Sequence, residues 1–195
     1  MIGDQGSLTV VSGTYRAWIP MTTQTYCTDY NINLDVSFGE NSQTKIIPVG
    51  SNFSIGFGSC CWLTNLVVGV AGSWSIVSRI NTALRLDGYI NSSPFVATLP
   101  VIYKQINVQY VHAVQMSDPD RTDVLKCRWS TKTLPNTNSY DECGGVCNGI
   151  PGAILNGNNC TITFTLQKAN TYAVLALQIE DYYSNTTTAT MSSTR

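Results

Sequence analysis

The fold is decided by two neighbouring segments, Cys160-Thr-Ile-Thr-Phe-Thr-Leu166 and Tyr172-Ala-Val-Leu-Ala-Leu-Gln-Ile179. Both are rich in β-branched, aromatic and aliphatic residues and predict β-strands. After Glu180-Asp181-Tyr182-Tyr183 the chain becomes rich in serine and threonine, with no further apolar strand. A β-sandwich normally closes with such a strand, because an open edge leaves backbone groups unpaired and a core face uncovered. The sequence therefore predicts that the sandwich stops one strand short, or that another chain supplies its last strand.

Short strands separated by turn residues recur along the rest of the chain, a spacing typical of all-β sandwiches. Asn91-Ser-Ser-Pro94 and Thr98-Leu-Pro100 interrupt this pattern between the two halves. We predict an all-β protein with two immunoglobulin-like β-sandwiches in tandem, an N-terminal domain of residues 1–97 and a second domain of residues 98–195. The other strands that we expect cover residues 7–11, 14–19, 32–38, 45–49, 53–57, 66–70, 74–80, 83–87, 105–111, 113–116 and 123–129.

The composition bounds the class of protein. Charged residues make up 12% of the 195 residues, and the net charge is −1. This balance argues against nucleic acid as a partner, because nucleic-acid recognition needs a basic face. The low charge also favours self-association. No apolar run is long enough to span a bilayer, so we expect no membrane span.

The cysteines and asparagines indicate an extracellular, secreted protein. Four Asn-x-Ser/Thr sequons predict N-linked glycans, and abundant cysteine favours an oxidising compartment. The chain has one histidine and no Cys-x-x-Cys pattern, so zinc is poorly supported. The sequon asparagines are Asn52, Asn91, Asn159 and Asn185, and the disulfide candidates are Cys27, Cys60, Cys61, Cys127, Cys143, Cys147 and Cys160.

Four of the cysteines surround a long loop from Thr131 to Asn158, which predicts that local disulfides pin this loop. Their pairing cannot be deduced from the sequence. Cys60 and Cys61 are adjacent, so in a strand their side chains would point to opposite faces, and one of them is expected to pair with Cys27. Because the chain has seven cysteines, one thiol is left over, either buried as a small hydrophobe or bonded to another chain.

Calcium is a candidate cofactor. Asp118, Asp120 and Asp123 lie close enough in sequence to converge on one hard cation, and Asp181 would join them from the end of the domain. Calcium prefers several carboxylate and carbonyl oxygens. The alternative is an Asp-Pro turn that caps a hairpin through side-chain-to-backbone hydrogen bonds, with Arg121 neutralising the acids.

No catalytic pattern is visible, and we expect no enzyme activity. His112 lies in a strand pattern, without a serine elbow, paired carboxylates or a phosphate-binding glycine loop. A sugar-binding platform of tryptophans is a further hypothesis, but each tryptophan lies in an apolar strand setting, which favours core packing. The four tryptophans are Trp18, Trp62, Trp74 and Trp129.

Eight short motifs stand out along the chain: Phe57-Gly-Ser-Cys-Cys-Trp62, Gly72-Ser-Trp-Ser-Ile76, Ser117-Asp-Pro-Asp120, Cys127-Arg-Trp129, Glu142-Cys-Gly-Gly-Val-Cys147, Pro151-Gly-Ala153, Cys160-Thr-Ile-Thr-Phe164 and Leu177-Gln-Ile-Glu-Asp181. Together they resemble a repeated module of large extracellular proteins of aquatic invertebrates. The resemblance implies an extracellular location and a structural or adhesive role, without known chemistry. In that family another apolar strand usually follows the Ile-Glu-Asp stretch. The Ser-Asp-Pro-Asp turn also resembles the opening turn of cadherin-like and dystroglycan-type immunoglobulin folds.

Self-assembly is the function that these features favour. Ser7, Leu8, Thr9, Val10 and Val11 form a short uncharged strand that could be donated to a neighbour. Strand donation is a known recognition mode, and head-to-tail donation generates rings or filaments. We expect an extracellular structural protein, the subunit of a glycosylated fibre built by strand exchange, with copies of itself and glycans as partners. The alternative is a cell-surface adhesion or carbohydrate-binding module from a longer secreted protein.

Overall fold

The computed structural model of the chain describes residues 6–32, 36–99, 101–120, 123–183 and 191–194. These residues form β-strands and one short 3-10 helix, η1 (Gly144–Val146), so the prediction of an all-β protein is confirmed. In this part of the chain no helix is long and apolar enough to cross a membrane. The strands are β1 (Ser7–Gly13), β2 (Met21–Thr22), β3 (Tyr26–Asn31), β4 (Val36–Glu40), β5 (Asn52–Ser59), β6 (Trp74–Asn81), β7 (Phe95–Ala97), β8 (Gln109–Ala113), β9 (Gln115–Ser117), β10 (Asp123–Trp129), β11 (Ile154–Asn156), β12 (Thr161–Thr165), β13 (Leu177–Tyr183) and β14 (Met191–Thr194).

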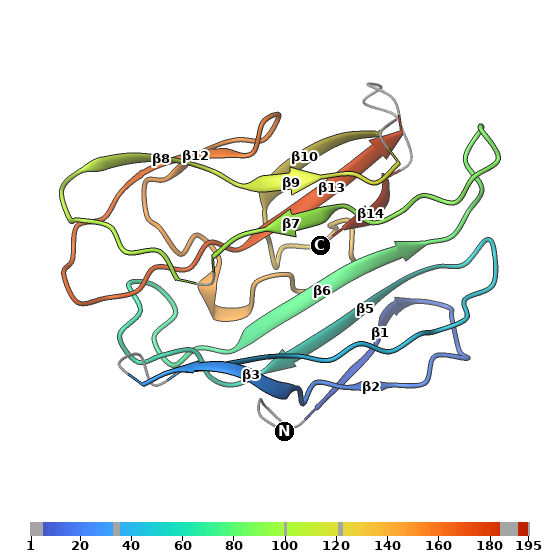
Figure 1. The fold of residues 1–195 in the computed structure, drawn as a ribbon, viewed down its shortest axis with the longest axis horizontal. Coiled ribbons are helices and arrows are strands. Elements are labelled where there is room, and N and C mark those ends of the chain that lie inside the picture. Colours follow the sequence, from blue (N-terminus) through green and yellow to red (C-terminus); the bar gives the residue numbers. More distant parts are fainter. Residues whose placement is uncertain (1–5, 33–35, 100, 121–122, 184–190, 195) are drawn as a thin grey trace.

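One long antiparallel sheet runs through the molecule in the order β10-β13-β14-β6-β5-β1-β2 (Figure 1). It contains strands from both sides of the predicted domain boundary. The link between the two sides is β14, which pairs with β13 at Glu180↔Thr194 and with β6 at Ser193↔Ile80. The two halves of the chain therefore share one sheet.

The strand β14 corrects one expectation, because the sequence predicted no strand after Tyr183. Met191-Ser-Ser-Thr194 has one apolar residue and no strand-like apolar pattern. Its extended form comes instead from the backbone ladders that β13 and β6 offer on either side. A strand held in this way carries almost no signal in its own composition.

Smaller sheets cover β10 and β13. Side chains of the three-stranded sheet β11-β12-β8 and of the two-stranded sheet β7-β9 pack against those of β10 and β13. The core between these layers contains two groups of buried side chains that share Val114, Leu155 and Leu177 as neighbours. One group is Cys127, Cys160 and Ile179, and the other is Ile150, Ile162 and Phe164. This packing is the apolar core of the second half of the chain.

The first half buries aromatic side chains along β5. Phe53 is fully buried and stacks on Tyr15 at 4.7 Å between ring centroids. Phe57 meets Trp74 of β6 edge to face at 5.5 Å. Such pairs add roughly 0.5–1.5 kcal/mol each beyond their buried area. The β5–β6 ladder is therefore held by aromatic packing as well as by backbone hydrogen bonds.

Several predicted strands are loops in the structure. Residues 14–19, 45–49, 66–70 and 83–87 have no regular strand. Pro48 lacks the N–H that a ladder needs, and Ile46, two residues earlier, is 93% exposed. Gly69 has φ +80°, and a Cβ there would collide with the backbone of Gly145. These segments have apolar residues but lack the backbone geometry of a strand.

Candidate functional site

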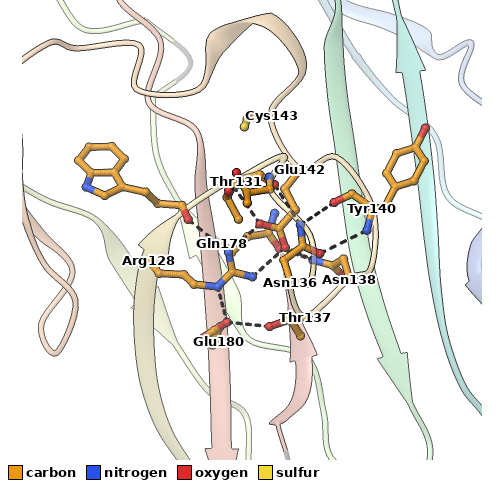
Figure 2. Close-up of polar contacts among 12 residues, drawn as sticks. Arg128, Thr131, Asn136, Thr137, Asn138, Tyr140, Glu142, Cys143, Gln178 and Glu180 are labelled. Carbon is orange, nitrogen blue, oxygen red and sulfur yellow. Dashed lines mark hydrogen bonds and ion pairs between the residues drawn. The ribbon is translucent and has the colours of Figure 1, made fainter.

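A buried polar network lies where the loop after β10 crosses between β13 and β5 (Figure 2). Its centre is Asn138, which is fully buried. The Asn138 amide donates to Glu142 at 2.7 Å and to Gln178 at 3.1 Å. Ser12 in β1 donates to the Asn138 carbonyl at 2.6 Å, and Ser54 in β5 donates to its side-chain oxygen. The loop is thus bonded to strands of both halves of the chain.

The charged part of this network is centred on Arg128. Its guanidinium binds Glu142 with two hydrogen bonds of 2.6 and 2.7 Å, and it donates to Glu180 at 2.7 Å. The backbone N–H of Thr131 also donates to Glu142. Tyr182 donates its hydroxyl hydrogen to Glu180 at 2.6 Å. A bidentate arginine–carboxylate pair of this kind fixes geometry as well as charge.

These contacts change the pKa values of the network. Burial alone would lower the pKa of Arg128, but the hydrogen bonds to Glu142 and Glu180 raise it overall. Burial alone would raise the pKa of Glu142, but the hydrogen bonds from Arg128, Thr131 and Asn138 lower it overall. Burial and the Glu180 contact raise the pKa of Tyr182 to about 12. Arg128 and Glu142 therefore stay charged at neutral pH and act as a structural ion pair.

A second polar cluster contains the predicted calcium ligands. Asp118, Asp123 and Asp181 each bring a carboxylate oxygen within 4.8 Å of the others. Asp120 is directed elsewhere: it accepts a hydrogen bond from Arg85 at 3.1 Å and one from the backbone of Ser92. Three of the four predicted ligands are thus brought together, and Arg85, a cation of the protein itself, contacts both Asp120 and Asp123.

The same region also contains features of the alternative to calcium, an Asp-Pro turn with side-chain-to-backbone hydrogen bonds and an arginine that neutralises the acids. The backbone N–H of Asp120 donates to Asp118, which is a side-chain-to-backbone turn contact. The positive charge comes from Arg85, whose guanidinium lies 3.0 Å from Asp123 and 3.0 Å from Asp87. Arg121, the residue expected to neutralise the acids, lies outside the described residues.

Asp181 is the most perturbed acid in this cluster. It is fully buried, and this burial raises its pKa to about 8, with Asp118 and Asp123 adding negative charge nearby. The amide of Asn91 donates to Asp181 and opposes this shift. In the absence of a bound cation, Asp181 therefore holds its proton at neutral pH.

We predict that this proton makes stability depend on pH. The unfolded chain releases it near 3.8, whereas the folded chain keeps it to about 8. The stability from Asp181 is therefore fully present below pH 3.8 and is lost as the pH rises through about 8. Urea unfolding with a chelator at a series of pH values should show this decline, and Asp181→Asn should reduce it. Equal pH dependence in both proteins would contradict the assignment.

Calcium stays a prediction, and the same measurement tests it. Bound calcium would replace the proton, because its ligands must be ionised. Calcium chloride added at pH 8 would then raise the unfolding midpoint of the natural chain but not that of Asp123→Asn. If calcium raised neither midpoint, the hypothesis would fail.

The sequons differ in their surroundings. Asn52 and Asn159 are exposed, whereas Asn91 is half-buried and hydrogen-bonded in the acidic cluster. Asn185 lies outside the described residues. N-linked glycans remain a prediction.

The cysteines form three disulfides: Cys127–Cys160, Cys143–Cys147 and the adjacent pair Cys60–Cys61. The first two hold the long loop, as the sequence predicted. The expected bond between Cys27 and one of the adjacent pair does not form, because Cys60 and Cys61 bond to each other. Cys27 is free, and it is exposed in β3 rather than buried.

The remaining candidates take ordinary places in the fold. The predicted donor residues form most of β1, which pairs with β5 of the same chain at Thr9↔Gly56 and Val10↔Ile55. His112 lies in β8 opposite Ile162 of β12. The four tryptophans are all partly buried rather than fully exposed, and they are Trp18, Trp62, Trp74 and Trp129.

Comparison with models of known protein families, with curated proteins and with solved structures finds no match to this chain. The site must therefore be interpreted from its own chemistry. Its contacts are bonds that fix loops and strands to one another. Sequence reasoning missed Arg85, Arg128, Asn138 and Glu142 as partners in these contacts, and it assigned Asn91 only as a glycosylation site. The signal that could have found Arg128 is its place as a charged residue between Cys127 and Trp129 in a strand.

Proposed function

We propose that this chain is an extracellular structural protein, the subunit of a glycosylated fibre that assembles head to tail by exchange of a β-strand. The observation that carries the proposal is the position of β14. This strand has four residues, whereas its neighbours β13 and β6 have seven and eight. Among the described residues, the single register pair Ser193↔Ile80 joins β14 to β6. A short strand in the middle of a long sheet is the natural element to exchange.

The energetics of exchange favour this position. A strand from a second copy would make the same backbone hydrogen bonds that β14 makes within its own chain. Each hydrogen bond broken within one chain is then replaced by an identical one between two chains, so a small bias decides which arrangement forms. The net charge of −1 provides little electrostatic opposition to close packing of copies. The expected donor strand β1 offers a second route by the same reasoning, through its ladder with β5.

The extracellular setting is supported by the three disulfides, which persist in oxidising compartments. The resemblance to modules of large extracellular proteins supports the same setting. We also propose that the two halves are immunoglobulin-like sandwiches in tandem, joined through β14. On this account, release of β14 separates the sheet into β10-β13 and β6-β5-β1-β2, and a second copy can enter between them.

Engineered disulfides test the exchange. We predict that Ile80→Cys with Ser193→Cys, in a Cys27→Ser background, yields covalent multimers on a non-reducing gel. Their Cα atoms face each other across the ladder, so a bond forms between whichever chains share it. Addition of a reductant should collapse the multimers to single chains. A product that stays monomeric, with its bond inside one chain, would contradict exchange at β14.

The matched control moves one cysteine along β6. Ile76→Cys with Ser193→Cys keeps two new thiols but separates them by about 13 Å, because a strand rises about 3.3 Å per residue. This pair should form no specific multimers. If it formed the same multimers as the test pair, the bonds would reflect random oxidation. The rival function, a monomeric adhesion or sugar-binding module, predicts dispersed single chains in both experiments.

A further inference from the structure

Asn91 is bonded at every polar atom of its side chain. Its Oδ1 accepts a hydrogen bond of 2.8 Å from Arg85. Its Nδ2 donates one hydrogen bond to Asp181 and another, of 3.0 Å, to the backbone oxygen of Ser92. A primary amide has two N–H hydrogens, and both are used here. The side chain therefore bridges the guanidinium of Arg85 and the buried carboxyl of Asp181.

Asn91 is also the acceptor of a sequon, Asn91-Ser92-Ser93. In N-glycosylation the amide nitrogen attacks C1 of a sugar carried on a lipid diphosphate. A nitrogen–carbon bond forms, the bond from C1 to the diphosphate breaks, and one amide hydrogen leaves as a proton. The modified nitrogen keeps a single N–H. It cannot donate to both Asp181 and Ser92, and the sugar would have to occupy the place of one acceptor.

The exposed sequons have no such conflict. Asn52 begins β5 with its side chain exposed, beside an open hollow of about 240 Å³ that Tyr15 and Val49 help to line. Asn159 is exposed in the turn between β11 and β12. A glycan on either residue can extend into solvent without displacing a hydrogen bond of the acidic cluster.

We infer that the folded protein carries N-glycans at Asn52 and Asn159 and leaves Asn91 unmodified. A glycan on the Asn91 amide is incompatible with the hydrogen bonds that this amide makes in the Arg85–Asp181 cluster. The inference rests on the secretory route in the proposed function, but it does not depend on assembly. Glycans are added to the chain before it folds, so chains modified at Asn91 fold poorly and are depleted from the secreted pool. Losing a hydrogen bond to a buried carboxyl disfavours the modified fold by at least about tenfold.

The test uses the full chain secreted from a eukaryotic cell line, with occupancy of each sequon measured by glycopeptide mass spectrometry. We expect high occupancy at Asn52 and Asn159, and occupancy at Asn91 about tenfold lower or less. Ser93→Ala is the matched variant, because it removes the sequon, lies at an exposed position and leaves the Asn91 amide in place. It should leave the mass of the secreted glycoprotein and its unfolding midpoint unchanged.

Two results would overturn the inference. A glycan on Asn91 in folded, secreted protein, seen also as a mass loss of one glycan in Ser93→Ala, would show that the cluster tolerates the modification. Secreted protein without glycans at Asn52 and Asn159 would contradict the inference that these two exposed sequons are modified. The proposed function can fail independently of this inference. It fails if the secreted protein carries glycans at Asn52 and Asn159 and none at Asn91 but remains monomeric.

Discussion

Glu142→Ala is expected to destabilise the protein by about 3 kcal/mol, the lower end for a broken buried ion pair, because Arg128 is 29% exposed and keeps Glu180 as a partner. Glu142 has no exposed side-chain surface, and it accepts hydrogen bonds from Arg128, Asn138 and the backbone of Thr131. The substitution removes an acceptor from all three donors, although Arg128 keeps Glu180 and Asn138 keeps Gln178. Urea unfolding measures the loss, and hydrogen exchange at the Thr131 amide reports whether the loop is released.

Glu40→Ala is the control for this prediction, since Glu40 is an exposed carboxylate in β4. Its effect should stay within about 0.5 kcal/mol. The double variant Arg128→Met with Glu142→Leu should cost less than the sum of the single changes, because the Arg128–Glu142 pair is removed as a whole and only Glu180 loses its cation. A loss below about 1 kcal/mol for Glu142→Ala would mean that the network is not a structural ion pair.

Replacement of both Cys127 and Cys160 by alanine is also expected to have a large effect. It should lower the free energy of unfolding by about 4 kcal/mol, according to the relation between loop length and chain entropy. The disulfide closes a loop with a sequence separation of 33, whereas Cys143–Cys147 closes one of 4. The same relation gives about 2 kcal/mol for the shorter loop. Unfolding of the two double-alanine variants by denaturant should therefore rank them in this order.

Cys27→Ser serves as the reference, because Cys27 is exposed and free. It should leave the free energy of unfolding within about 0.5 kcal/mol of the natural chain. Cys127 and Cys160 also lie in the apolar core. If the free energy of unfolding falls by more than loop closure predicts, the excess is the contribution of their packing in the core. Equal losses for the long and short loops would contradict loop closure as the main source of stability.

The strands that could be predicted from the sequence are those whose own apolar side chains pack in the core. β5, β6, β10 and β12 alternate or concentrate apolar residues, and the structure places β5, β6 and β12 inside their sheets and β10 at the edge of the long sheet. The prediction for residues 45–49 was wrong because Pro48 breaks the ladder, and that for 66–70 was wrong because Gly69 approaches Gly145 too closely for a side chain. β14 was missed for the opposite reason, since its strand form depends on its neighbours.

The acidic site was predicted in part. Asp118 and Asp123 are close in sequence, and Asp181 comes from β13, which pairs with β10 at Leu125↔Asp181. Their convergence therefore follows from a plausible strand pairing. Arg85 and Asn91 come from a distant segment whose position no local pattern encodes. The pairing of Cys60 with Cys61 was also out of reach, because side chains alternate between faces in a strand, whereas this bond forms just beyond the end of β5.

Electron microscopy of the native, unreduced protein tests the central claim most directly. The account predicts regular filaments with a repeat of one subunit, and their loss when residues 184–195 are deleted. Dispersed single particles at high protein concentration, for the natural chain and the deletion variant alike, would contradict assembly by strand exchange.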